Sequence, residues 1–148
     1  MRTTFKTLLL ALPLLAAGFA ASAADGPAGR WKTIDDNTGK VKSIVEISQA
    51  GNGTLSGKVL QVLQSDKGPH PVCDKCDGTN KNKPIEGMTI LWNLSPDGTN
   101  KWNDGTILDP AKGKTYSSKI ELIDGGNKLE VSGCIAFICR SQTWLREQ

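Results

Sequence analysis

The chain has 148 residues, of which 18 are basic and 15 acidic, and it contains a single histidine. Its length fits one domain with a single hydrophobic core, and the near balance of charge argues against a nucleic-acid-binding protein. The sequence has neither a serine-nucleophile elbow nor a glycine-rich phosphate loop, so we expect neither enzyme activity nor a cofactor.

The first 23 residues have the pattern of a secretory signal peptide. Arg2 and Lys6 supply a positive start, Leu8–Phe19 is an apolar run of 12 residues, and Ala21-Ser22-Ala23 fits the cleavage site. The run is shorter than the ~20 residues of a membrane-spanning helix, although an uncleaved N-terminal anchor is the alternative interpretation. We therefore expect residues 24–148 to be a single mature domain, periplasmic or secreted, without stable membrane insertion.

Beyond this segment, short apolar runs alternate with clusters of Gly, Asn, Asp and Pro, and helical periodicity is almost absent. The pattern predicts eight strands and one long loop over residues 65–86. The predicted strands span residues 31–35, 43–48, 54–64, 88–94, 101–108, 114–123, 128–134 and 137–146.

Eight strands joined mostly by short turns predict an antiparallel up-and-down meander. An open meander leaves two unpaired edges, whereas closure removes both and leaves an interior that side chains fill or that holds one small ligand. We therefore predict an all-β, eight-stranded antiparallel barrel, with an open sandwich as the competing architecture. In the strand at 88–94, alternation places Met88, Ile90, Trp92 and Leu94 on one side.

Aromatic side chains fall on neighbouring predicted strands in the middle of the chain. Ligand pockets are mostly apolar and aromatic, with a few placed polar groups. Five residues are therefore candidates for the wall of a cavity inside the barrel, and the alternative is that they simply fill the core. These are Met88, Ile90, Trp92, Trp102 and Tyr116.

Polar side chains gather around the turn that follows the strand at 101–108. Asp104, Asp109 and Lys114 are candidates for anchoring a polar part of a ligand. However, Asp109-Pro110 followed by Gly113 is also typical of a turn in which the carboxylate accepts local N–H groups. The single histidine, His70, has no partner nearby in the sequence, which favours a solvated loop residue over a general base.

Four cysteines in an exported chain predict two disulfides. Proximity in the sequence pairs Cys73 with Cys76 and Cys134 with Cys139. The second pair requires a turn or bulge between its members, because residues five apart face opposite sides of a regular strand. Zinc held by Cys73, Cys76 and two further ligands is the alternative, but we expect no metal. A redox role for the C-x-x-C is disfavoured, because that chemistry needs a helix start.

Several segments together resemble a bacterial exported family, domain-of-unknown-function family 2147. The resemblance covers essentially all of the mature chain in the same order, and it implies a lipocalin-like barrel without an established activity. The central match is Trp102–Pro110 followed by Gly113–Tyr116, and the others are Gly29–Asp35, Ser43–Ile47, Cys73–Cys76, Pro84–Met88 and Arg140–Trp144.

In lipocalin-like barrels, a tryptophan on the first strand closes one end beneath an arginine of the last strand. Gly29, Trp31 and Arg146 match these positions, with Arg140 as the second candidate for the arginine. We expect these residues to close the barrel, so that a small, largely apolar ligand would enter the interior at the other end. The alternative function is a cell-envelope interaction module acting through its surface and the cysteine-containing loop.

Overall fold

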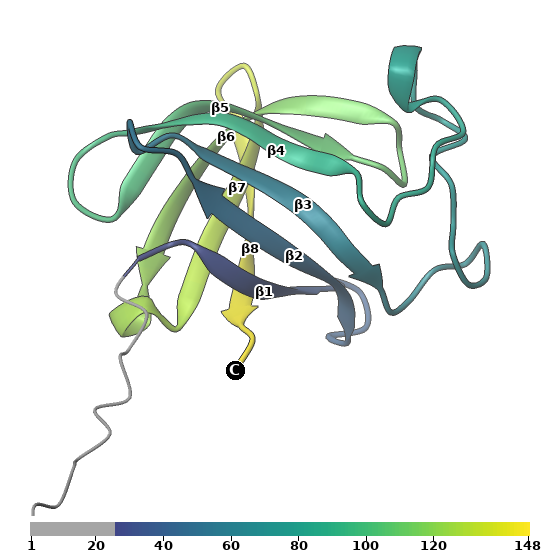
Figure 1. Cartoon of the computed structure of the whole chain (residues 1–148), viewed down its shortest axis with the longest axis horizontal. Coiled ribbons are helices and arrows are strands. Elements are labelled where there is room, and N and C mark those ends of the chain that lie inside the picture. The colour runs from purple at the N-terminus through teal and green to yellow at the C-terminus, as the bar shows by residue number, and fades with distance from the viewer. Residues whose placement is uncertain (1–25) are drawn as a thin grey trace, which may run out of the picture.

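Eight antiparallel strands follow one another along the chain and close into a barrel in the computed structural model, which describes residues 26–148 (Figure 1). The signal segment expected at residues 1–23 lies outside the described residues. The strands are β1 Gly29–Ile34, β2 Val41–Gln49, β3 Leu55–Val62, β4 Thr89–Pro96, β5 Lys101–Asp109, β6 Lys114–Ile123, β7 Lys128–Ile135 and β8 Ile138–Arg146.

Every strand pairs with the next along the chain, and β8 returns to pair with β1. This closure confirms the predicted barrel and excludes the open sandwich. Within residues 26–148 the remaining regular structure is two single-turn 3-10 helices, η1 Gly78–Asn80 and η2 Asp124–Gly126. The eight strands lie close to the predicted ranges, because Gly-, Asn- and Asp-rich turns end them where the sequence indicates.

The barrel interior is packed with large apolar side chains. The glycines on β3 and β5 make room for two leucines, because a Cβ at Gly57 would lie 3.0 Å from Leu91 Cβ and one at Gly105 would lie 2.4 Å from Leu94 Cγ. The largest fully buried apolar side chains in this core are Trp31, Val45, Ile47, Leu55, Leu91, Leu94 and Leu129.

The side chains of β4 do not alternate as the sequence predicts. Leu91 pairs with Gly57 and Ile107 and faces the interior, and Leu94 pairs with Leu55 on the same interior face. Three residue steps separate these two leucines, because Asn93 between them adopts a left-handed backbone conformation with φ of 58°. The expectation that Trp92 shares a side with Leu94 is therefore wrong.

Candidate functional site

One end of the barrel is closed by an arginine stacked on a tryptophan. The guanidinium carbon of Arg146 lies 4.3 Å from the ring centroid of Trp31. Its nitrogens donate hydrogen bonds to the carbonyls of Gly126 at 2.7 Å, Ala28 at 3.1 Å and Gly26 at 2.6 Å. Burial lowers the pKa of Arg146 below its ordinary value. All three of these hydrogen bonds end on backbone carbonyls, so the arginine ties the ends of neighbouring segments together and seals this end.

The third of the predicted closure residues, Gly29, lies directly beneath this arginine. A Cβ at Gly29 would come within 3.1 Å of Arg146 Nη1, and the backbone has a φ of 127°, which glycine adopts readily. Arg140 is excluded from the seal, because it pairs with Gly133 at the opposite end of β8.

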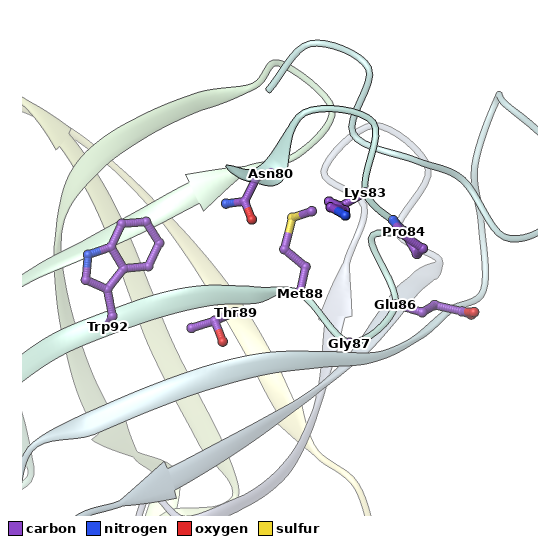
Figure 2. A pocket seen from close by; sticks show the side chains of 8 residues that line it. All are labelled: Asn80, Lys83, Pro84, Glu86, Gly87, Met88, Thr89 and Trp92. Atoms are coloured by element: carbon purple, nitrogen blue, oxygen red, sulfur yellow. The ribbon is translucent and has the colours of Figure 1, made fainter. Parts of the chain in front are cut away.

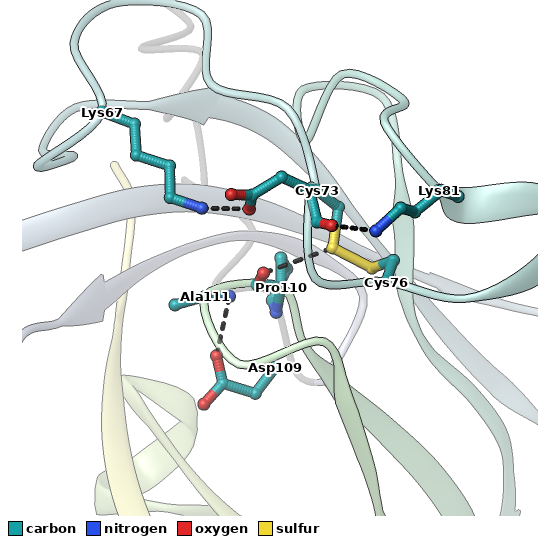
Figure 3. Close-up of a disulfide and its surroundings, with 8 residues drawn as sticks. Lys67, Cys73, Cys76, Lys81, Asp109, Pro110 and Ala111 are labelled. Atoms are coloured by element: carbon teal, nitrogen blue, oxygen red, sulfur yellow. Dashed lines mark hydrogen bonds and ion pairs between the residues drawn. A yellow bond between two sulfur atoms is a disulfide. The ribbon is translucent and has the colours of Figure 1, made fainter.

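A disulfide anchors the long loop between β3 and β4. Cys73 and Cys76 are bonded and almost completely buried. Cys73 Sγ lies 3.3 Å from the carbonyl oxygen of Pro110 in the β5–β6 turn (Figure 3). A Cβ at Gly113 of that turn would lie 2.0 Å from the Lys75 carbonyl oxygen, so the backbones of loop and turn meet closely. This contact places the loop against the barrel.

Backbone hydrogen bonds fix the returning half of the same loop. Cys73 N–H donates to Lys83 O at 2.8 Å, and Asn82 N–H donates to Cys73 O at 2.9 Å. An isolated bridge joins Val72 to Pro84. An ion pair of Lys67 with Asp74, drawn in Figure 3, adds a side-chain contact. The loop is therefore a fixed wall.

Glu86 ties the end of the loop to β3. Its carboxylate accepts a hydrogen bond from the Val62 N–H at 3.0 Å and contacts His70 Nδ1 at 2.9 Å. The Val62 N–H, followed by His70, holds the pKa of the Glu86 carboxyl below its ordinary value. His70 is mostly solvent-exposed, and its role here is as a partner of Glu86.

A groove of roughly 540 Å³ lies between this loop and the start of β4. Figure 2 shows Met88, directly before β4, and Trp92 on β4 projecting on the side of Asn80, with Lys83 and Pro84 beyond Met88. Trp92 pairs with Thr106, one step from the inward pair Leu91 and Ile107, so its indole lies on the outer face. The complete lining is Asn80, Lys83, Pro84, Glu86, Gly87, Met88, Thr89 and Trp92.

The structure therefore divides the five predicted cavity residues between two places. Met88 and Trp92 line the outer groove, and Ile90 between them is buried beside an irregularity in the pairing with β3. Trp102 pairs with Ile120, and Tyr116 pairs with Ile107, both on the inward face. The expectation of one shared wall inside the barrel is corrected, because the pairing register separates Trp92 from the two inward rings.

The inward group contains two polar atoms without a partner among the described residues. Trp102 Nε1 and Ser118 Oγ are buried and make no hydrogen bond. Gly105 pairs with Ser118, and Trp102 pairs with Ile120, so both atoms come from neighbouring positions of β5 and β6. Such groups are uncommon in packed cores.

The three predicted polar anchors do not form one cluster. Asp109 Oδ1 accepts the Ala111 N–H at 3.0 Å, and its Oδ2 lies 3.5 Å from Lys112 Nζ, so its carboxylate serves its own turn. Lys114 is the strand partner of Asp109. Asp104 lies five residues away along β5, which corresponds to about 16 Å in an extended strand. A ligand role for these residues stays a prediction.

The other cysteine pair closes the β7–β8 hairpin. Cys134 and Cys139 are strand partners and are bonded to each other. Between them, Ala136 has a φ of 51°, which provides the turn that this pairing needs. Within residues 26–148, no group of three or more His, Cys, Asp and Glu side chains is arranged to hold a metal ion. In the same part of the chain, no helix is long and apolar enough to span a membrane.

The sequence indicates the cysteine-containing loop as an interaction surface in the alternative function but identifies none of the loop residues that line the groove. Asn80 and Lys83 carry no motif, and the strand pattern does not reach them. The available signal was the length of the loop, because connections longer than about 12–15 residues are often functional.

A closed eight-stranded barrel sealed by a stacked tryptophan and arginine is a lipocalin-like fold. The family described as "Uncharacterized protein conserved in bacteria (DUF2147)" matches residues 29–146, and the chain belongs to this family. Among solved structures, the chain is similar to protein HP1028 from the human pathogen Helicobacter pylori, which is described as belonging to the lipocalin family. That similarity has a TM-score of 0.68 and 18% identity and covers 82% of each chain, so it shows the fold. No curated protein matches the chain.

Proposed function

We propose that this is an exported, non-enzymatic binding protein that holds a small, largely apolar ligand in the groove between the disulfide-anchored loop and β4. The observation that carries the proposal is the outward Trp92 beside Met88 under a fixed loop wall. The signal-like N-terminus and the two disulfides support export, because disulfides persist in oxidising compartments.

The groove has the size and the lining that ligand sites commonly have. Its roughly 540 Å³ falls within the ~300–1,000 Å³ range of small-molecule pockets. The half-buried indole of Trp92 offers a flat, polarizable surface, and the largely buried Met88 lies beside it at the base of the groove. A planar apolar group is therefore the expected part of the ligand on the β4 side.

The loop side of the groove adds polar groups. Lys83 presents an exposed ammonium and Asn80 a half-buried amide. The Glu86 carboxylate is already engaged with Val62 and His70. The favoured ligand is therefore apolar and planar, with a carboxylate, sulfonate or carbonyl facing Lys83 and Asn80.

A direct test uses anilinonaphthalene sulfonate, a planar apolar probe with one anionic group. Titration of the wild-type protein should give saturable fluorescence enhancement with one probe per chain. Trp92→Ala should abolish saturable binding, and Lys83→Gln should weaken it about three- to tenfold, because it removes a charged partner. Leu145→Ser, which changes an exposed residue of β8, is the matched control and should bind like the wild type.

The same titration separates the groove from the barrel interior. Tyr116→Phe alters only the inward side and should leave probe affinity unchanged. Binding that survives Trp92→Ala but falls in Tyr116→Phe would reject the groove and favour a ligand inside the barrel. Fractionation of an expression host, with N-terminal sequencing of the product, tests export, and a full-length protein confined to the cytoplasm would contradict it.

A further inference from the structure

The β7–β8 turn carries three large apolar side chains into solvent. Phe137 has a relative exposure of 101%, Ile138 of 77% and Ile135 of 65%. We call Ile135–Ile138 the apolar tip. Figure 1 shows the β7–β8 turn projecting from the barrel as a free loop. It lies at the end opposite the Arg146 seal and takes no part in the groove beside β4.

The tip is held in one shape even though its side chains have no core to pack against. Ile135 and Ile138 are strand partners, and the Cys134–Cys139 disulfide lies directly beneath them. A rigid, exposed apolar turn loses little conformational entropy when it is buried by another surface. This arrangement therefore favours docking.

Basic side chains accompany the tip. Arg140 follows it by two residues on β8, and Lys114 begins β6, the strand that pairs with β7. Neither forms an ion pair with any of residues 26–148, whereas the nearby Lys112 is paired with Asp109 at 3.5 Å. The end of the barrel that bears the tip therefore presents two free positive charges.

The size and shape of the tip distinguish between occupants. A stable dimer or protein complex buries about 800 Å² per partner. Even if each of the three side chains buried about 150 Å², the lower value for an aromatic ring, the convex turn would supply at most roughly 450 Å². Attachment to a lipid surface does not require a buried area of that size. A few inserted apolar side chains and adjacent basic groups suffice for reversible attachment to anionic lipids.

We propose that the apolar tip docks the protein reversibly on an anionic phospholipid surface. Phe137 and Ile138 enter the boundary between headgroups and acyl chains, while Arg140 and Lys114 contact lipid phosphates. The barrel then stands on the membrane by the end opposite its seal.

Sedimentation with extruded vesicles tests this docking. The protein is taken as an expression host processes it, with its mass checked so that all variants share one N-terminus. The wild type should sediment with phosphatidylglycerol-containing vesicles and much less with pure phosphatidylcholine. Phe137→Ser with Ile138→Ser should reduce partitioning by at least about tenfold, because two exposed apolar side chains are removed. Leu145→Ser, at the other end of β8, should not reduce it.

A second double variant measures how much the two basic side chains contribute to vesicle binding. Arg140→Gln with Lys114→Gln should lower binding to phosphatidylglycerol vesicles several-fold and weaken its salt dependence. All substituted tip positions are exposed, so thermal melts should coincide with the wild type, and the single variant Phe137→Ser serves if the double variant melts early.

Three results would overturn the proposal. The first is a wild type that sediments with neither vesicle. The second is a tip variant that is folded and still binds like the wild type. The third is a wild type that is dimeric by light scattering and becomes monomeric in the tip variant, which would assign the tip to a second copy. None of these results bears on probe binding in the groove.

Discussion

Replacing Arg146 by methionine keeps much of the side-chain length and removes the guanidinium that seals the barrel. Three backbone carbonyls then lose a donor, and the face of Trp31 loses the group stacked on it at 4.3 Å. The carbonyls belong to Gly26, Ala28 and Gly126, so the change releases the entry of β1 and the β6–β7 turn together.

The loss in the free energy of unfolding depends on how exposed each lost contact is to solvent. The bonds to Gly126 and Gly26 are partly buried, and each contributes about 1.5 kcal/mol, the lower value for a charged donor. The exposed bond to Ala28 contributes little, because water replaces it. The cation–π contact adds about 1 kcal/mol. We therefore expect Arg146→Met to lower the free energy of unfolding by about 4 kcal/mol.

Urea unfolding followed by far-UV circular dichroism measures this loss directly. For a domain of this size, the same loss should lower the Tm by about 15 °C. Arg140→Met, at the other end of β8, is the matched control. As an exposed change it should stay within about 0.5 kcal/mol of the wild type. If Arg146→Met melted within about 3 °C of the wild type, the seal would not stabilise the fold.

Further expectations follow from the same contacts. Replacing both cysteines of Cys134–Cys139 by serine should cost about 2 kcal/mol in urea unfolding, the loop-closure value for a short loop. The same change at Cys73–Cys76 should cost more, because it also buries two hydroxyls. A smaller loss of unfolding free energy at Cys73–Cys76 than at Cys134–Cys139 would contradict the role of Cys73–Cys76 in anchoring the loop. Ser118→Ala should raise the free energy of unfolding by about 1 kcal/mol, because it removes a buried hydroxyl without a partner, and a decrease would reveal a partner inside the barrel. The pKa of Glu86 is lowered in the folded protein, so its ionised carboxylate stabilises the fold at pH values above 4.5, the ordinary pKa of the group. This stabilisation is lost as the pH falls through the lowered pKa. Urea titrations of Glu86→Gln between about pH 5 and pH 3 should therefore show a smaller acid loss than the wild type, and an equal loss would count against the Val62 contact.

The strands of the barrel could be predicted from the sequence because turns and alternation are patterns of residues close together in the chain. Turns rich in glycine and asparagine end each strand, and alternation identifies inward residues such as Ile120 and Leu122, which pair with Val131 and Leu129 as one wall of the core. The pairing of cysteines three and five residues apart was also within reach, because short separations leave few geometric choices.

The candidate groove was beyond sequence reasoning for two physical reasons. Asn93 adopts a left-handed conformation that asparagine tolerates but does not require, and this single residue shifts the alternation of β4. The loop wall depends on contacts between residues far apart in the chain, such as Cys73 with Pro110 and Lys75 with Gly113. No local pattern encodes those contacts.

The sequence by itself predicted the strands, because strand periodicity and turn chemistry act on short segments, and it favoured a closed barrel, because closure removes both sheet edges. The residues that seal the barrel came from the resemblance to lipocalin-like barrels. Only the tertiary structure decided which face of β4 presents Trp92 and where the cysteine loop lies. It also decided that Phe137 and its neighbours remain in solvent at a clamped turn. Those features depend on the pairing register and on packing at long range, and they carry both proposals about function.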